Sequence, residues 1–506
     1  MIRIARTENG VVRGIEASDP RITIFKGIPY AAPPVGKNRW RKPQPCADWQ
    51  GIRDASRFAP AAMQDIPGLG DDIYTKEWHV DPEIEMSEDC LYLNIWTNAK
   101  VPEDKLPVMI WFFGGAYQWG YPQEMEFDGE RLAGRGVIVV SVNYRINVFG
   151  FLAHPELTKE QSDAPTNFGY LDQLAGMLWV RKNITAFGGD PEQITIAGQS
   201  AGGGSVMAHL TSEKSRGLFQ KAIIESGVFS NPYREKIIFK TRKLISAEAE
   251  GDRFFHHLGV NNLKEAREVS ARTIRDQYAE YVKKYSYMGP VIDDRFCREN
   301  PLSLFMKNEY YKVPILTGNT SDEFISSIDA DTKDELTEKI KKLFAPDHEQ
   351  LFNETNVVYN KNSKHYFPIN TIETATKAMI KRNLILGNQN PIYYYYFDAD
   401  IPGDHAGCFH SVDLWFFFET LSKSWRPFHG RHYDLSRKMC SYWGNFIKTG
   451  DPNGIDRNGD LLPEWKCCSM SEPYGIIFSE DYIRDNSCAD APILEFMIEK
   501  CMNEMT

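Results

Sequence analysis

The 506-residue chain has no excess of positive charge: 58 Lys and Arg residues against 69 Asp and Glu residues give a formal net charge of −11. Nucleic acids and anionic membrane surfaces do not attract such a protein, so neither is expected as its main partner. No apolar run approaches the roughly 20 residues of a membrane-spanning helix, and the first residues, MIRIARTENGVVRG, lack the apolar core of a secretory signal. These absences predict a cytoplasmic protein that acts on small molecules and does not associate with membranes.

Cysteine is spread along the chain without the spacing of a metal site. The nine cysteines form no Cys-x-x-Cys pair, the usual sign of structural zinc, and the adjacent Cys467 and Cys468 are expected to be incidental. Thiols stay reduced in the cytoplasm, so free cysteines are the expectation. We expect neither a metal nor another cofactor.

Six apolar runs of strand length are spaced along the chain, at residues 108–113, 137–144, 221–225, 313–317, 392–397 and 474–478. Helix-compatible stretches, such as residues 171–181 and 439–448, lie between them. Continuous apolar runs suit strands that are buried on both faces of a parallel sheet. The alternation predicts an α/β fold with a large, mostly parallel central sheet flanked by helices.

Two polar stretches interrupt this alternation, at approximately residues 231–307 and 325–390. We expect them to form helical insertions near the active site, over or beside the sheet, with a lid as one role open to them. No internal repeat or low-complexity linker marks a domain boundary. Residues 1–506 are therefore expected to form a single catalytic domain.

The stretch TIAGQSAGGGSVMAHL, residues 195–210, is typical of a strand, a sharp turn and a helix. Ser200 lies at the apex of Gly-x-Ser-x-Gly, where the flanking glycines let a strand and a helix pass without Cβ clashes. Its hydroxyl is expected to face solvent, and the Ala201 amide to lie at a helix N-terminus, which favours an oxyanion. The pattern predicts a nucleophile; a glycine-rich turn that binds an anion, or nothing, is the alternative.

A serine nucleophile needs a base, and the base needs a carboxylate that orients it. In this type of fold the acid precedes the histidine along the chain. His410 is the favoured base because it lies in a glycine-containing loop after a predicted strand, and His405 is the rival. Asp322 and Glu323 both follow another predicted strand, so both are candidates for the acid. A helix cap at this place is the alternative.

Small residues follow the buried run at 108–113, in the order Gly114, Gly115 and Ala116. Backbone amides in such a loop can approach a substrate carbonyl oxygen, and each such donor is worth about 2.7–4 kcal/mol of transition-state stabilisation. We therefore expect an oxyanion hole here. A plain turn that closes a strand is the alternative.

Six longer motifs are distinctive: FKGIPYAAPPVGKNRW (residues 25–40), SEDCLYLNIW (87–96), WFFGGAYQWG (111–120), NFGYLDQLAGMLWV (167–180), FGGDPEQITIAGQSAGG (187–203) and TGDPN (449–453). Together they resemble the type-B carboxylesterases, α/β-hydrolases that include cholinesterases and bacterial para-nitrobenzyl esterases. The resemblance covers nearly the whole chain. It implies an α/β-hydrolase fold and a bacterial serine carboxylic-ester hydrolase that works through an acyl-enzyme.

Carried over residue by residue, the resemblance makes Ser200 the nucleophile, Glu323 the acid and His410 the base. The oxyanion donors that it implies are Gly115, Ala116 and Ala201, with Gly114 and Ser226 in supporting positions. It thereby chooses between Asp322 and Glu323 and between His405 and His410, which spacing alone leaves open.

Three residues depart from what the resemblance implies. Phe113 stands where the family usually has His or Tyr, so a hydrogen bond from that side chain is missing. Phe324 follows Glu323 where relatives commonly have Gly, which affects the loop that carries the acid. Cys90 has no earlier partner at residues 60–64, where secreted relatives have one, so that loop is expected to be unbridged.

Aromatic residues near the predicted site suggest the kind of substrate. Tyr117, Trp119, Trp415 and Phe416 are the candidates for the pocket, which we expect to be narrow, apolar and poor in polar anchors. Trp78 and His79 are expected on the surface, with a pocket rim as the alternative. We therefore expect a monomer or weak homodimer that hydrolyses short-chain or aromatic esters. The alternatives are a cinnamoyl or feruloyl esterase and, in another class, a non-catalytic binding protein on the same fold.

Overall fold

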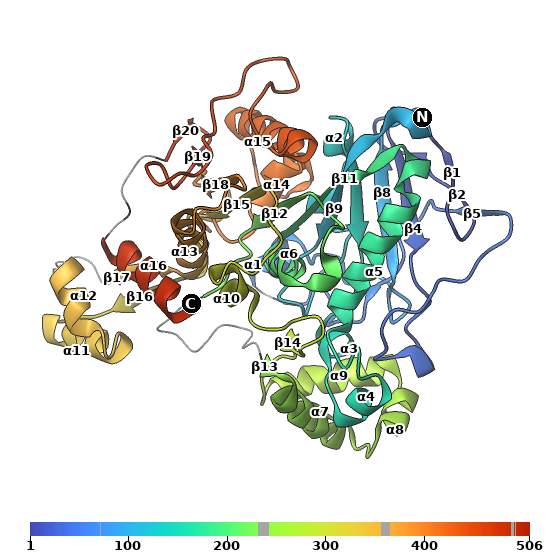
Figure 1. Ribbon diagram of the computed structural model, residues 1–506, viewed down its shortest axis with the longest axis horizontal. Helices are drawn as coiled ribbons and strands as arrows, with labels where there is room; N and C mark the ends of the chain where they lie inside the picture. Colours follow the sequence, from blue (N-terminus) through green and yellow to red (C-terminus); the bar gives the residue numbers. More distant parts are fainter. Residues whose placement is uncertain (71, 231–241, 356–364, 487–489, 491, 506) are drawn as a thin grey trace.

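The computed structural model describes residues 1–70, 72–230, 242–355, 365–486, 490 and 492–505. Its centre is a sheet of 11 strands (Figure 1). From one edge to the other, the strands of this sheet are β20 (Ile483–Asp485), β19 (Ile476–Phe478), β18 (Ile392–Phe397), β15 (Ile315–Thr320), β12 (Lys221–Glu225), β11 (Gly189–Gln199), β9 (Leu106–Phe112), β10 (Ile138–Val142), β8 (Tyr92–Thr97), β4 (Thr23–Pro29) and β3 (Ile15–Glu16).

The middle of the sheet is parallel and its two edges are antiparallel. The strands from β10 to β19 pair in parallel, whereas β8, β4 and β3 on one side and β20 on the other pair antiparallel. The central strands are the continuous apolar runs of the sequence, and burial on both faces is what such runs favour. The predicted α/β fold with a mostly parallel sheet is confirmed.

Helices cover both faces of the sheet (Figure 1). One layer holds α5 (Phe168–Asn183), α6 (Ala201–Thr211), α10 (Pro301–Met306), α13 (Thr371–Ile385) and α16 (Pro492–Met505), and the other holds α2 (Glu130–Ala133), α14 (Asp413–Phe417) and α15 (Gly430–Thr449). The remaining short elements of the described chain outside the two polar stretches are α1 (Ile73–Glu77), α3 (Asn147–Phe151), α4 (Pro155–Glu160), strands β1 (Ile4–Arg6), β2 (Val11–Arg13), β5 (Ile52–Asp54), β6 (Ala61–Ala62) and β7 (Met86–Ser87), and 3-10 helices at Gly36–Asn38, Pro102–Asp104, Met125–Phe127, Ile184–Phe187, Glu213–Ser215 and Leu421–Lys423.

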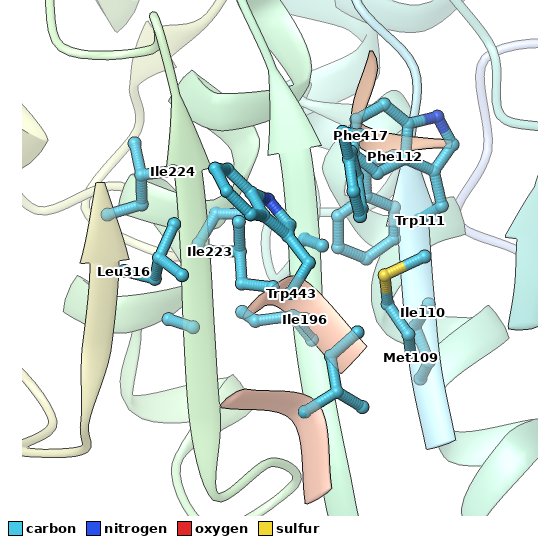
Figure 2. Packing of buried hydrophobic residues seen from close by; sticks show 14 of the residues in the cluster. Met109, Ile110, Trp111, Phe112, Ile196, Ile223, Ile224, Leu316, Phe417 and Trp443 are labelled. Atoms are coloured by element: carbon cyan, nitrogen blue, oxygen red, sulfur yellow. The ribbon is translucent and has the colours of Figure 1, made fainter. Parts of the chain in front are cut away.

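The main core lies between the sheet and these helices (Figure 2). Side chains of the central strands, such as Ile196 and Ile223, are fully buried there. They pack with Phe417 of α14 and Trp443 of α15, whose rings lie 5.5 Å apart. Burial of this apolar surface, at about 25 cal/mol per Å², is the main force that holds the helices against the sheet.

Both polar stretches contain several helices, and neither of them is purely helical. The first contains β13 (Arg242–Lys243), α7 (Leu244–Leu258), α8 (Leu263–Glu268), α9 (Ala271–Val282), β14 (Val291–Ile292) and α10, and the second contains β16 (Ile325–Asp329), α11 (Lys333–Leu343), α12 (His348–Thr355), β17 (His365–Asn370) and α13. The strands β16 and β17 form an antiparallel pair. Helix α13 packs on β15, so it belongs to the layers of the sheet.

Apart from α10 and α13, the helices of these stretches lie at the ends of the molecule (Figure 1). In Figure 1, α7, α8 and α9 gather at the lower end, and α11 and α12 lie at the left beside α16. Residues 231–241 and 356–364, which belong to the predicted insertions, lie outside the described residues. No helix in the described ranges combines the length and the apolar character that crossing a bilayer requires.

Candidate active site

The candidate residues follow the carboxyl ends of neighbouring parallel strands. Gln199 at the end of β11 pairs with Glu225 at the end of β12, and Glu225 pairs in turn with Gly318 of β15. Ser200 and Ser226 are the next residues after the first two strands. Open α/β sheets place their binding sites at this edge, because the strand ends bring successive loops together.

The turn at Ser200 has a backbone conformation that L-residues rarely adopt, with φ 55° and ψ −123°. The flanking glycines explain how the chain reaches it. A Cβ on Gly198 would lie 2.4 Å from the carbonyl carbon of Gly202, and a Cβ on Gly202 would lie 2.0 Å from the Phe112 oxygen. The predicted strand, sharp turn and helix are therefore confirmed, together with the steric reason for both glycines.

Glu323 and His410 form a buried pair beside this turn. His410 Nδ1 is hydrogen-bonded to Glu323 Oε2, and both residues are buried. The other carboxylate oxygen, Oε1, accepts hydrogen bonds from Ser226 Oγ at 2.5 Å and from the Thr320 amide at 3.0 Å. These donors fix the carboxylate, which in turn fixes the orientation of the imidazole ring.

The other two candidates, Asp322 and His405, make different contacts. Asp322 is exposed, and its Oδ2 accepts a hydrogen bond from the Cys408 amide at 2.7 Å. This contact joins the loop of Glu323 to the loop of His410. The element that follows Asp322 is strand β16, so the helix-cap interpretation is wrong. His405 is exposed and lies outside the cavity described below.

The loop after β9 has the strained backbone of a turn that packs closely. Gly115 has φ 93° and Ala116 has φ 56°, and a Cβ on Gly115 would lie 2.2 Å from the Trp119 oxygen. On the other side of Ser200, Ala201 is the first residue of α6. Among the backbone hydrogen bonds of turns, loops and caps in the part of the chain that the structure describes, none has the amide of Gly115, Ala116 or Ala201 as its donor.

A cavity of about 450 Å³ opens beside Ser200 and His410. Its described lining also includes Gly114, Gly115, Ala116, Trp119, Gln199, Phe324 and Leu414 from the loops above, and Asp65, Asp72, Tyr74, Trp78, His79, Glu124, Glu126 and Phe127 from two earlier segments. The volume falls in the range of ordinary small-molecule sites, which is roughly 300–1,000 Å³. Nucleophile and base candidates thus share one binding cavity.

Of the four aromatic pocket candidates, only Trp119 lines this cavity. Tyr117 belongs to a buried cluster, where the hydroxyl of Tyr170 donates to its hydroxyl at 2.9 Å. Trp415 and Phe416 are fully buried in the main core. The prediction is wrong for these three residues. Tyr117 packs in its own buried cluster, and α14 turns Trp415 and Phe416 between the sheet and α15 instead of toward the loops.

The cavity is also more polar than predicted. Trp78 and His79, expected on the surface, line it, as do Glu124 and Glu126. His79 Nδ1 lies 3.2 Å from Glu124 Oε1. Burial lowers the pKa of His79, but the charge and hydrogen bond of Glu124 outweigh it and raise the pKa overall. No spacing in the sequence indicates that these residues share a site, because they lie in separate loops.

Two further carboxyl groups lie buried behind the pair and were missed by the sequence interpretation. Tyr395 donates to Asp413 Oδ2 at 2.7 Å, and Trp443 donates to Glu225 Oε1 at 2.5 Å. Burial, together with the nearby charge of Glu323, raises the pKa of Asp413 to about 6, although the hydrogen bond from Tyr395 opposes this rise. Burial and the charge of Asp413 raise the pKa of Glu225. Only the tertiary fold brings these groups together.

The three departures from the family pattern each have a structural outcome. The ring of Phe113 stacks on Tyr144 at 4.3 Å, and the Tyr144 hydroxyl donates to the Phe113 oxygen at 2.6 Å, which anchors the loop through the backbone. Phe324 is 44% exposed and its ring lies 4.4 Å from that of His410, so it forms part of the cavity wall. Cys90 is buried as a free thiol.

Known proteins that resemble this chain in sequence are esterases and related hydrolases. The sequence profile of the Carboxylesterase family matches residues 2–477. Fumonisin B1 esterase of Sphingopyxis macrogoltabida is 37% identical over 322 residues, which are 63% of this chain and 56% of that protein. Pyrethroid hydrolase Ces2e of Rattus norvegicus is 30% identical over 516 residues, which cover 93% of this chain and 85% of that protein.

A solved structure extends the likeness to three dimensions. The crystal structure of Geobacillus stearothermophilus carboxylesterase EST55 at pH 6.2 is 29% identical, with a TM-score of 0.75 over 96% of this chain and 98% of that one. The family match spans nearly the whole chain, and the sheet and helix layers agree with the structure of this relative. The chain therefore belongs to the carboxylesterase family, has its α/β-hydrolase fold and is a carboxylic ester hydrolase.

Proposed function

We propose that the protein hydrolyses esters through an acyl-enzyme on Ser200, with His410 as general base and Glu323 as the carboxylate that orients it. The observation that carries this proposal is the buried hydrogen bond between Glu323 and His410 Nδ1 beside a cavity that Ser200 also lines. A carboxylate at Nδ1 keeps the proton there and leaves Nε2 free to accept the proton of the serine.

The proposed reaction has two halves. Ser200 Oγ attacks the ester carbonyl while His410 Nε2 takes its proton, and the imidazolium then protonates the departing alcohol. The amides of Gly115, Ala116 and Ala201 are the proposed donors to the oxyanion. Gly115 and Ala116 line the cavity with Ser200, and Ala201 follows Ser200 at the start of α6. In the second half, His410 takes a proton from water, the resulting hydroxide attacks the acyl group, and the imidazolium returns the proton to Ser200 Oγ as the carboxylic acid leaves.

Covalent labelling tests the proposal and separates it from a non-catalytic binding protein. A fluorophosphonate probe is expected to label the wild type but not Ser200→Ala, because it reacts only with an activated serine. Turnover of 4-nitrophenyl acetate is expected to be lost in His410→Ala and kept in His405→Ala, the matched control on the same loop. Labelling of Ser200→Ala, or retained turnover in His410→Ala, would contradict the assignment.

Short-chain and aromatic esters are the proposed substrates. Trp119, Phe127 and Phe324 give the cavity apolar walls that suit an aryl group or a short acyl chain. We expect kcat/KM to fall along the series from 4-nitrophenyl acetate and butyrate to palmitate, without activation by emulsified lipid. Preference for long-chain triglyceride would contradict this proposal.

A feruloyl or cinnamoyl ester is a second candidate, which one observation favours. Glu126 lines the cavity, and burial together with the charge and hydrogen bond of Glu124 raises the pKa of its carboxyl group. A phenolic hydroxyl both donates and accepts, so it can hydrogen-bond with such a carboxyl group. Methyl ferulate is then expected to be hydrolysed with a lower KM than methyl cinnamate, which lacks the hydroxyl; equal values would argue against this candidate.

We also propose a cytoplasmic protein that is a monomer or weak homodimer and comes from a bacterium. The cysteines within the described residues are free thiols, in keeping with a reducing compartment. Light scattering over a range of concentrations tests the oligomeric state, and a stable tetramer would contradict it.

A further inference from the structure

Two consecutive residues of one loop contact the imidazole of His410. The carboxylate of Glu323 binds its Nδ1, and the ring of Phe324 lies 4.4 Å from the imidazole ring at an interplanar angle of 40°. Phe324 is 44% exposed and lines the cavity, so part of its surface faces the space into which a substrate binds. The proposed acid and an aromatic wall of the cavity are therefore neighbours in the sequence.

Two hydrogen bonds hold this loop against the loop of His410. The amide of Asp322 donates to the Cys408 oxygen at 3.1 Å, and Asp322 Oδ2 accepts from the Cys408 amide at 2.7 Å. Asp322 lies two residues before Phe324, just as Cys408 lies two residues before His410. The backbone therefore sets the place of the Phe324 ring beside the imidazole, although the side chain is partly exposed.

The chemistry of the reaction decides which half of an ester lies beside this ring. The imidazolium must protonate the leaving oxygen, so that oxygen comes within about 2.6–3.2 Å of His410 Nε2. The carbonyl oxygen points instead to the proposed oxyanion donors. A substituent on the leaving oxygen therefore begins next to the imidazole. Two aromatic residues of the described cavity lining contact the imidazole ring, and Phe324, at 4.4 Å, is nearer than Tyr74, at 6.4 Å.

We propose that Phe324 is a specificity-determining residue that binds the alcohol half of the ester and favours aryl and arylmethyl alcohols. This assignment rests on the proposed function, in which His410 protonates the departing alcohol. Aromatic rings attract one another in offset-stacked and edge-to-face arrangements beyond the effect of burying their surface. A saturated ring of the same size lacks this part of the attraction, so Phe324 discriminates between the two.

Capture of the acyl-enzyme by added alcohols tests this assignment. 4-Nitrophenyl butyrate acylates Ser200, and the butyryl group then passes to water or to an alcohol, while His410 takes the proton of the attacking hydroxyl and returns it to Ser200 Oγ. The attacking alcohol occupies the place that the leaving alcohol has vacated. Benzyl alcohol and cyclohexylmethanol, present together at equal concentrations, compete for the same acyl-enzyme. The ratio of benzyl butyrate to cyclohexylmethyl butyrate therefore measures the selectivity between an aromatic and a saturated ring.

Phe324→Leu keeps an apolar side chain and removes the ring, so this product ratio is expected to fall about fivefold relative to the wild type. A change in the basicity of His410 affects both products equally and cancels in the ratio. The control is Phe58→Leu, the same substitution at a residue that is 38% exposed and lies outside the described cavity lining. Its ratio is expected to equal that of the wild type. An unchanged ratio in Phe324→Leu would overturn the assignment.

A binding measurement without turnover keeps this test separate from that of the proposed function. Dissociation constants of the two alcohols are measured by ligand-observed NMR for Ser200→Ala, with and without Phe324→Leu. The preference for benzyl alcohol is expected to fall about fivefold when Phe324 is replaced. If it falls while Ser200→Ala retains esterase activity, the proposed function fails and the aromatic contact stands. If it does not fall, the assignment of Phe324 fails whatever the activity of Ser200→Ala.

Discussion

Replacing Ser200 by glycine is expected to abolish ester hydrolysis and to stabilise the protein. The residue has φ 55° and ψ −123°, close to the first central position of a type II′ turn, which glycine occupies without strain. A side chain held in such a region costs about 1–3 kcal/mol. Ser200→Ala keeps the Cβ and the strain, whereas Ser200→Gly removes both. The difference in stability between these two variants therefore reports the cost of the strained backbone.

The expected difference follows from three contributions. Relief of strain is worth about 1–3 kcal/mol, the greater freedom of glycine in the unfolded chain costs about 0.5–1 kcal/mol, and loss of the largely buried Cβ costs up to about 0.8 kcal/mol. The free energy of unfolding of Ser200→Gly is therefore expected to exceed that of Ser200→Ala by about 1 kcal/mol. For a chain of 506 residues, this is about 1 °C in Tm.

Chemical denaturation resolves a difference of this size better than a thermal scan. The control is Ser205 inside helix α6, where glycine is expected to be about 1 kcal/mol less stable than alanine. The sign of the Gly-minus-Ala difference should thus be opposite at residues 200 and 205. The same sign at both residues would show that the Ser200 backbone stores no strain.

Three further predictions concern the groups around the site. Ser226→Ala removes one of the donors to Glu323, so kcat on 4-nitrophenyl acetate is expected to fall about tenfold with KM little changed, because Ser226 lies outside the cavity lining; a purely KM effect would contradict this. The pKa of Asp413, raised to about 6, means that the folded state binds more protons than the unfolded state, so stability falls as pH rises from about 4 through 6. Asp413→Asn escapes this loss, and its stability relative to the wild type is expected to rise by about 1 kcal/mol between pH 5 and pH 8 in urea unfolding, whereas a constant difference would refute the argument. Activity is expected to be unaffected by EDTA; complete, reversible loss with the chelator would contradict a metal-free reaction.

The sheet could be predicted from the sequence because its signal is local. The runs at 221–225 and 392–397 coincide with β12 and β18. An unbroken apolar segment of that length is typical of a strand that is buried on both faces of a sheet. The second polar stretch was predicted less well. Helix α13 looks polar in sequence, yet it packs on β15 and buries Lys377, whose ammonium group pairs with Glu373 and Asp490. A buried ion pair of this kind has no sequence signature.

The candidate site also has parts that could be predicted from the sequence and parts that could not. The turn at Ser200 could be predicted because its glycines are adjacent in sequence and have a steric cause. The choice of Glu323 over Asp322 rested on resemblance, since both residues follow β15 and only the tertiary contacts distinguish them: one binds His410, and the other binds the amide of Cys408. Two neighbouring carboxylates on one loop therefore have different partners: Glu323 binds the His410 side chain, and Asp322 binds the backbone of the loop that carries His410.

The chemical character of the cavity could not be predicted, because its walls come from loops whose side-chain directions depend on contacts elsewhere. The run Trp415–Phe418 is the strongest aromatic signal near His410, and it is buried entirely in the core. Glu124 and Glu126 lie in a segment with no evident pattern, and they line the cavity instead. Within the described lining, carboxyl groups occur without any Lys or Arg. A lining that holds carboxyl groups and no Lys or Arg disfavours anionic ligands, and no local pattern of the sequence predicts this property because the carboxyl groups come from separate loops.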